Sequence, residues 1–236
     1  NMKLASGTAP VSGAVTNMKY IAVNHTYATQ GPKLAVLTVT DGAANIDVDT
    51  VEIEVAPRTS EVEINAAIES GLRWLYLQQN VSGYWNDNYG YPIAATALSV
   101  LSFENQGHLP ANDYNKDIYA QYVKAGLDYV TSRLAVVSVP IQTYGNPEDA
   151  APGNMDANGF GIFPSSGNPL YEVGMVMMAL VASKAPDMIS PTGPANVIGR
   201  PYRDLVVDMV DYCAWSQSES GGARGGWRYA PNYGSS

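Results

Sequence analysis

Two loops of the sequence are rich in oxygen-bearing side chains of the kind that bind a hard cation. The first is Asn86-Asp87-Asn88, and the second contains Glu148, Asp149, Asn154, Asp156 and Asn158. Calcium takes its ligands from carboxylate and amide oxygens, but the spacing is not that of the helix–loop–helix calcium motif. Asn and Asp are also common in solvated turns. We therefore expect no cofactor at these loops, and a calcium site is the alternative hypothesis.

The chain contains one cysteine and two histidines, which restricts nucleophilic and zinc chemistry. Cys213 falls at an apolar position of a predicted helix, where a free cysteine usually behaves as a small hydrophobic residue. His108 follows Gly107 at a predicted helix end, where a basic side chain suits the terminal carbonyl groups. His25 lies in a predicted strand or turn. No serine has a plausible histidine–acid pair and no zinc-ligand spacing exists, so we predict no catalytic, cofactor-binding or metal-binding residue.

Two further kinds of candidate site lie in loops. Asn24-His-Thr26 and Asn80-Val-Ser82 match the acceptor sequence for glycosylation of asparagine. Tyrosines also gather near two tryptophans, and a tyrosine ring with its polar hydroxyl could stack on a sugar or form a protein interface. The alternative is packing within the fold. The tyrosines concerned are Tyr84, Tyr89, Tyr91, Tyr229 and Tyr233.

The composition excludes several classes of partner. The 236 residues include 13 lysines and arginines against 22 aspartates and glutamates, which gives a formal net charge of −9. Such a chain lacks the clustered basic side chains that bind nucleic acid or an anionic membrane surface. Hydrophobic residues make up 46% of the chain, enough for a folded core, but no apolar run reaches the roughly 20 residues of a membrane-spanning helix. We expect no nucleic-acid partner and no membrane span.

The hydrophobic pattern changes near residue 57, and this change predicts two domains. Residues 19–55 alternate between apolar and polar side chains with β-branched enrichment, which is typical of half-buried strands. From residue 60 onward apolar residues recur at helical spacing, with helices starting near residues 60, 92, 118, 168 and 201. We expect a β domain over residues 1–57 and a helical domain over residues 58–236, with every element after residue 59 an α-helix.

A short pattern recurs within the helical region. A helix end with an aromatic residue is followed by glutamine and then by a glycine-rich loop that closes on tryptophan. Tandem helical pairs stack so that each covers the apolar face of its neighbour, while the loop aromatic closes the helix end. A weaker copy joins residues 126–130 to residues 158–163. The pattern predicts structural roles for Gly71, Gln78 (or the adjacent Gln79), Gly83 and Trp85 in the first copy and for Gln217, Gly225 and Trp227 in the second.

Through this pattern, residues 60–236 resemble the terpenoid-cyclase/protein-prenyltransferase superfamily of α/α toroids. Residues 19–56 resemble the second half of a polycystic-kidney-disease-type (PKD) immunoglobulin-like domain, through Asn24-His-Thr-Tyr27-Ala-Thr-Gln-Gly31 and Leu37-Thr-Val-Thr-Asp41-Gly42. The two resemblances imply a multidomain chain of β and then α class. A partial Ig-like (PKD) β-sandwich would be followed by the antiparallel α-hairpin repeats of a partial toroid.

Resemblance to an enzyme fold does not confer the reaction of the enzyme. Cyclases of this superfamily protonate a polyene with an aspartate-rich motif, and the nearest match here, Asp47-Val-Asp49-Thr, lies in the predicted strand region. Protein prenyltransferases bind zinc through Asp, Cys and His, and the helical region has one cysteine and one histidine. The helical region therefore lacks both catalytic sets that the resemblance would lead us to expect.

Three functional hypotheses follow. The first is a non-catalytic structural or partner-binding module of a larger secreted or cell-surface protein, whose partners are other protein chains or the remainder of the same polypeptide. The second is a cyclase- or prenyltransferase-like enzyme that acts on an apolar substrate, with its catalytic residues outside this segment. The third is carbohydrate binding through the aromatic loops, with glycans as partners. We expect the first, in an extracellular location, and interpret the chain as an excerpt of a longer polypeptide.

Overall fold

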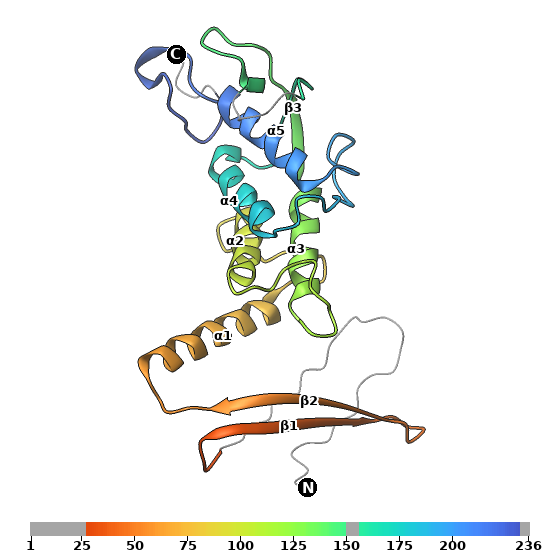
Figure 1. Cartoon of the computed structure of the whole chain (residues 1–236). Helices are drawn as coiled ribbons and strands as arrows, with labels where there is room; N and C mark the ends of the chain where they lie inside the picture. Colours follow the sequence, from red (N-terminus) through yellow and green to blue (C-terminus); the bar gives the residue numbers. More distant parts are fainter. Residues whose placement is uncertain (1–26, 150–155, 232–236) are drawn as a thin grey trace. The chain divides into compact units, whose positions relative to one another are not determined.

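The computed structural model describes residues 27–149 and 156–231. It divides into two compact units whose boundary lies between Gly71 and Leu72, inside the first helix and later than the change of hydrophobic pattern at residue 57. A β ribbon comes first along the chain and mainly helices follow (Figure 1). The predicted order of β structure and then α structure is therefore confirmed.

The described part of the N-terminal unit contains one antiparallel pair of strands. β1 (Gly31–Thr40) pairs with β2 (Ile46–Val55) over the full length of both strands. The connecting turn is closed by Asp41, whose Oδ1 accepts a hydrogen bond from the backbone N–H of Asn45 (2.9 Å). A two-stranded ribbon is at best marginally stable by itself, and the described residues of this unit contain no second sheet. The exposed large apolar side chains of β1 and β2 are Leu34, Val36, Leu37, Val39, Ile46, Val48 and Val51.

Five α-helices were predicted, and all five are present. They are α1 (Ser60–Gln78), α2 (Pro92–Glu104), α3 (Ala120–Ser132), α4 (Pro169–Ala182) and α5 (Tyr202–Trp215). Both α2 and α4 begin with proline, whose missing N–H costs nothing at the first position of a helix. Among the described residues, no helix is both long and apolar enough to cross a membrane.

The apolar helices α2 and α4 pack side by side at the centre of the C-terminal unit, with α3 against α2 and α5 against α4 (Figure 1). The only charged residues of α2 and α4 are Glu104 and Glu172, and both are buried. Glu172 Oε1 accepts a hydrogen bond from the backbone N–H of Ala94 (3.1 Å) in the first turn of α2. A carboxylate of α4 therefore caps the N-terminus of the neighbouring helix, where negative charge is favourable.

A second β ribbon corrects the expectation that everything after residue 59 is α-helical. β3 (Leu134–Ser138) pairs in antiparallel register with β4 (Phe160–Pro164). The ring of Phe163 stacks on that of Tyr212 in α5, with centroids 4.8 Å apart, and a side chain at Gly161 would collide with the same tyrosine. In the weaker copy of the sequence pattern, the aromatic residue that packs on a helix therefore lies in a strand. Short runs of strand-forming residues such as Val136-Val137 explain why the stretch between α3 and α4 forms strands and not a helix.

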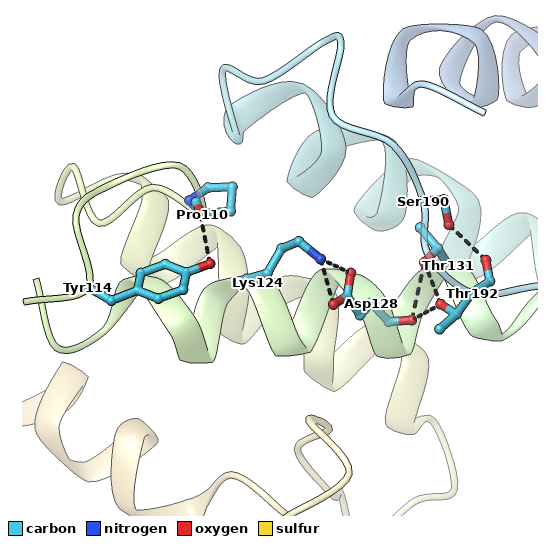
Figure 2. Close-up of polar contacts among 7 residues, drawn as sticks. All are labelled: Pro110, Tyr114, Lys124, Asp128, Thr131, Ser190 and Thr192. Atoms are coloured by element: carbon cyan, nitrogen blue, oxygen red, sulfur yellow. Dashed lines mark hydrogen bonds and ion pairs between the residues drawn. The ribbon is translucent and has the colours of Figure 1, made fainter. Parts of the chain in front are cut away.

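A polar network fixes the connection between α4 and α5 to the C-terminal end of α3 (Figure 2). Thr192 Oγ1 donates a hydrogen bond to the backbone oxygen of Asp128 (2.7 Å) and lies 3.1 Å from Thr131 Oγ1. Ser190 Oγ donates to the backbone oxygen of Thr192 (2.7 Å). Lys124 forms an ion pair with the Asp128 carboxylate (2.5 Å) one turn away on α3. The network supplies partners for polar groups in the last turns of α3 and holds the loop that leads into α5.

Candidate functional site

The first glycine–tryptophan loop, residues 79–85, closes the C-terminal end of α1. Trp85 is 3% exposed, and its indole Nε1–H donates a hydrogen bond to the backbone oxygen of Leu75 (2.7 Å) in the last turn of α1. Gly83 has a φ of +87°, and a Cβ atom there would lie 2.4 Å from the backbone oxygen of Ala125 in α3. Only glycine meets both demands. The loop is thereby locked between α1 and α3.

The second glycine–tryptophan loop, residues 217–227, closes the end of α5 with the same tryptophan bond. The Trp227 indole Nε1–H donates to the backbone oxygen of Cys213 (2.7 Å) in the last turn of α5. Trp227 is 55% exposed, so its ring is far less enclosed than that of Trp85. Gln217 is half-buried at the start of the loop.

The backbone hydrogen bonds within the two loops also follow the same pattern. In the first loop the N–H of Asn80 donates to the oxygen of Tyr84 (2.8 Å), and in the second the N–H of Ser218 donates to the oxygen of Gly226 (3.0 Å). The acceptor is in each case the residue directly before the tryptophan. The preceding glycine donates back across the loop in both (2.8 Å), and Gly225 has a φ of +78°. The two loops therefore share one hydrogen-bond pattern although they differ in length.

The glutamine and glycine positions of the first copy differ in importance. Of the two candidate glutamines, Gln79 and not Gln78 makes the stabilising bonds: its Nε2 donates to the backbone oxygens of Gly83 and Tyr122, both at 2.8 Å. Gln78 is the exposed last residue of α1. Gly71 lies inside α1, and no atom lies within 4 Å of a Cβ built there. Sequence alone could not choose between adjacent glutamines, because the choice depends on where α3 passes.

Two helical glycines give a matched test of the packing around Trp85. A Cβ atom at Gly126 in α3 would lie 2.5 Å from Val100 Cγ2 and 3.1 Å from the Trp85 ring, whereas one at Gly174 in α4 would meet nothing within 4 Å. We expect Gly126→Ala to lower the free energy of unfolding by about 1–3 kcal/mol because the helices must separate. Gly174→Ala should raise it by up to about 1 kcal/mol. Urea unfolding followed by circular dichroism checks both, and a Gly126→Ala variant as stable as the wild type would contradict the close approach.

The two aromatic loops come together at the N-terminus of α4. The rings of Tyr91 and Tyr171 lie 5.5 Å apart in an edge-to-face arrangement, and Asn168 Nδ2 donates a hydrogen bond to the Tyr91 hydroxyl (2.8 Å). The backbone N–H of Leu170 donates to the backbone oxygen of Tyr229 (3.3 Å). Tyr91 and Tyr229, which were predicted to form a binding surface, therefore lie in one region although they come from two distant loops. The Tyr91 hydroxyl and the Tyr229 backbone oxygen already accept hydrogen bonds within the fold.

The other residues predicted for binding or modification have varied surroundings. Tyr84 stacks on Tyr129 of α3 with centroids 5.0 Å apart, which is a packing role. Tyr89 is 86% exposed, and Asn80 is exposed in its turn, so both are accessible. Two predicted positions, Asn24 and Tyr233, lie outside the described residues.

Cys213 is half-buried in α5, as its apolar helical position predicts, but the His108 side chain binds a carboxylate and not the predicted helix-terminal carbonyl groups. Burial raises the pKa of the Cys213 thiol to about 11, so it is protonated at neutral pH and a poor nucleophile. His108 Nδ1 lies 3.0 Å from Asp117 Oδ1, and its ring packs against Phe103 and Tyr119. His25 lies outside the described residues.

Carboxylates in two of the acidic motifs accept hydrogen bonds from nearby backbone N–H groups. Asp87 Oδ1 accepts hydrogen bonds from the backbone N–H groups of Gly90 and Tyr91, both at 2.8 Å. Asp47 and Asp49 lie in β2, and each carboxylate accepts a bond from the N–H of the following residue (3.0 and 2.8 Å). These carboxylates therefore stabilise their own backbone.

The other acidic loop converges with α5. We call Glu148, Asp156, Asp208 and Asp211 the acidic cluster. Glu148 lies in the short 3-10 helix η1 (Pro147–Asp149), Asp156 precedes β4, and the other two lie one turn apart on α5. Carboxylate oxygens of Glu148, Asp156 and Asp211 lie within 4.8 Å of one another. Asn154 of the same predicted loop lies outside the described residues.

Burial and repulsion dominate the electrostatics of the acidic cluster. Arg200 Nη1 binds Asp208 Oδ2 (2.5 Å), and Asn158 Nδ2 donates to Asp208 Oδ1 (3.0 Å) and to Asp156 Oδ2 (2.8 Å). Burial still raises the pKa of Asp208. Burial also raises the pKa of Glu148, and repulsion from Asp156 adds to the effect. Sequence reasoning found Glu148, Asp156 and Asn158 but missed the acids of α5, whose signal is acidic residues at otherwise apolar positions of an amphipathic helix.

Comparisons with known proteins add no assignment, because no family model matches the chain and neither curated proteins nor solved structures give a significant match.

Proposed function

We propose that this chain is a non-catalytic structural or partner-binding module of a larger secreted or cell-surface protein, in which its helices form part of an α/α toroid. The observation that carries the proposal is the agreement between the two glycine–tryptophan loops. Each places an indole N–H on a carbonyl in the last turn of a helix, and each has a positive-φ glycine two residues before the tryptophan. Two distant helix ends closed by the same bonds support tandem units of one kind.

The surface of α4 supports a partner that is itself a helical unit. When α2 and α4 are aligned on their first prolines, the exposed side chains of Tyr171, Met178 and Val181 fall at the positions of Ala94, Leu101 and Glu104. Those three residues of α2 are buried or half-buried, whereas the residues of α4 are 49%, 49% and 63% exposed. We call the exposed set the α4 stripe. A further apolar helix packed there would cover α4 as α2 is covered.

The chemistry-bearing side chains support a non-catalytic role. The thiol of Cys213 is protonated, the ring of His108 is paired and packed, and Asp87 closes a turn. Each of these candidates therefore has a structural explanation in the described residues. The β ribbon of the N-terminal unit supports the Ig-like half of the proposal, since a second sheet of a PKD-type sandwich would cover its exposed apolar side chains.

Charges placed on the α4 stripe test the proposal. The isolated chain should self-associate through the stripe, with a second copy standing in for the next helical unit. Met178→Glu combined with Val181→Glu should abolish the association, because desolvating two carboxylates is costly. Val81→Glu is the control, since Val81 is 93% exposed and lies outside the stripe. Sedimentation velocity over a wide range of protein concentration gives the measurement.

Two outcomes would contradict the proposal. One is a wild-type chain that stays monomeric throughout, and the other is a control variant that loses association as fully as the double variant. Turnover of farnesyl diphosphate by a longer chain that contains this segment, but not by the segment alone, would instead support the cyclase- or prenyltransferase-like alternative.

A further inference from the structure

Three of the four members of the acidic cluster are buried, and the fourth, Asp156, is exposed at its edge. Asp208 and Asp211 are 0% exposed and Glu148 is 8% exposed. The guanidinium group of Arg200 is bound to Asp208 and also attracts the Asp156 carboxylate, so it brings a single positive charge to the four acidic side chains. Three of these have carboxylate oxygens within 4.8 Å of one another. Close carboxylates in a site of low dielectric repel strongly unless a proton or a cation lies between them.

Glu148 gives a second and independent indication of a ligand. Both of its carboxylate oxygens are buried, and neither accepts a hydrogen bond of normal geometry from the described residues, although the backbone N–H groups of Asn158 and Gly159 lie near enough to favour its charged form. Buried carboxylates in proteins are normally paired, hydrogen-bonded or bound to a metal. One of these oxygens lies within 4.8 Å of oxygens from both Asp156 and Asp211, so the side chain is directed into the cluster.

We propose that Glu148, Asp156 and Asp211 bind a calcium ion. Calcium–oxygen distances of about 2.3–2.6 Å allow ligand oxygens to lie up to about 5 Å apart across the ion, which accommodates the observed separation. The three ligands are all carboxylates, which suits a hard cation and not a zinc or copper ion. They come from a 3-10 helix, a loop and an α-helix, an irregular arrangement that suits calcium better than the strict octahedron of magnesium.

The ion would join residues 142–149 and Asp156, which lie between β3 and β4, to α5. Residues 142–149 already have two polar attachments to the end of α5 and the loop after it: Gln142 Nε2 donates to the backbone oxygen of Trp215 (2.6 Å), and the backbone N–H of Tyr144 donates to Glu219 Oε1 (3.3 Å). The guanidinium of Arg224 lies 3.6 Å from the centre of the Tyr144 ring. Calcium would therefore fix this segment next to the second glycine–tryptophan loop and stabilise the C-terminal unit.

The test compares variants of two proposed calcium ligands with a variant of a neighbouring acidic residue that is not a ligand. Glu148→Gln and Asp211→Asn remove proposed ligands, and Asp149→Asn is the control because Asp149 is exposed directly after Glu148. Titration calorimetry with calcium chloride and thermal unfolding in calcium or in a chelator are the measurements. We expect calcium to bind the wild type and Asp149→Asn with measurable heat and to raise their unfolding temperatures. Neither ligand variant should respond.

A separate measurement distinguishes lost binding from lost folding. In chelator, Glu148→Gln should unfold at a higher temperature than the wild type, because the substitution removes a repelling charge from the cluster. A folded Glu148→Gln variant that no longer responds to calcium supports the proposal. The proposal is overturned if calcium produces neither heat nor a thermal shift with the wild type, if Asp149→Asn loses the response as well, or if magnesium shifts the wild type as much as calcium does.

Discussion

Trp85→Ala is expected to be the most destabilising single substitution in the C-terminal unit, with a loss of about 3–5 kcal/mol in the free energy of unfolding. The side chain is 3% exposed and lies against Phe103 and the position of Gly126. Its indole N–H also satisfies the backbone oxygen of Leu75. Truncation would leave a large cavity and an open helix end. Urea unfolding followed by circular dichroism at a backbone wavelength measures the loss without relying on tryptophan fluorescence.

The second tryptophan is the natural comparison. Trp227 makes the equivalent bond to Cys213 but is 55% exposed, so Trp227→Ala should cost about 1 kcal/mol, the worth of one hydrogen bond. Trp85→Phe keeps an aromatic ring but lacks the indole N–H donor, so its loss in the free energy of unfolding should lie between those of the two alanine variants. Equal losses for Trp85→Ala and Trp227→Ala would show that enclosure of the first ring does not stabilise the fold.

Glu104→Gln is expected to stabilise the protein at pH 8 by about 3–5 kcal/mol. Glu104 is 4% exposed in the last turn of α2, and neither of its oxygens has a hydrogen-bond partner among the described residues. Burial raises its pKa from 4.5 to about 8. Between these values the folded protein holds a proton that the unfolded chain has released. Its contribution to stability is therefore complete below pH 4.5 and is lost as the pH rises through 8.

The glutamine variant isolates this contribution from those of other acids. Its side chain stays neutral, so its stability should exceed that of the wild type increasingly from pH 4.5 to pH 8, whereas the two proteins should be similar at pH 4.5. Glu69→Gln, which changes an exposed acid on α1, should show no such trend. Thermal unfolding across this range gives the comparison. A constant difference between wild type and Glu104→Gln at all pH values would mean that the carboxyl is not held neutral by burial.

The helices and the glycine–tryptophan loops could be predicted because their signals are local. Proline at the first position places the starts of α2 and α4, and a glycine before each tryptophan indicates a positive φ that few other residues adopt. The tryptophan bonds to helix ends follow from the same short stretch of sequence. Pairing of β3 with β4 was missed because the two strands are separated by a long connection and carry only five residues each.

The acidic cluster shows where sequence reasoning stops. Glu148 and Asp156 stood out as loop acids, but their meeting with Asp211 depends on how η1 and β4 pack against α5. The choice of Gln79 over Gln78 depends in the same way on the position of Tyr122 in α3. Contacts between residues far apart in the sequence require the packed structure, because local periodicity carries no information about the neighbouring element.

Hydrogen exchange of the indole N–H protons tests the central claim most directly. The claim is that two-helix units are locked by a tryptophan seated on a helix end. Proton NMR in D₂O, with resonances assigned through Trp85→Phe and Trp74→Phe, should show the Trp85 indole proton exchanging only when the C-terminal unit unfolds. The indole of Trp74, which is 61% exposed on α1, should exchange rapidly. A Trp85 proton that exchanges as fast as that of Trp74 would contradict the claim.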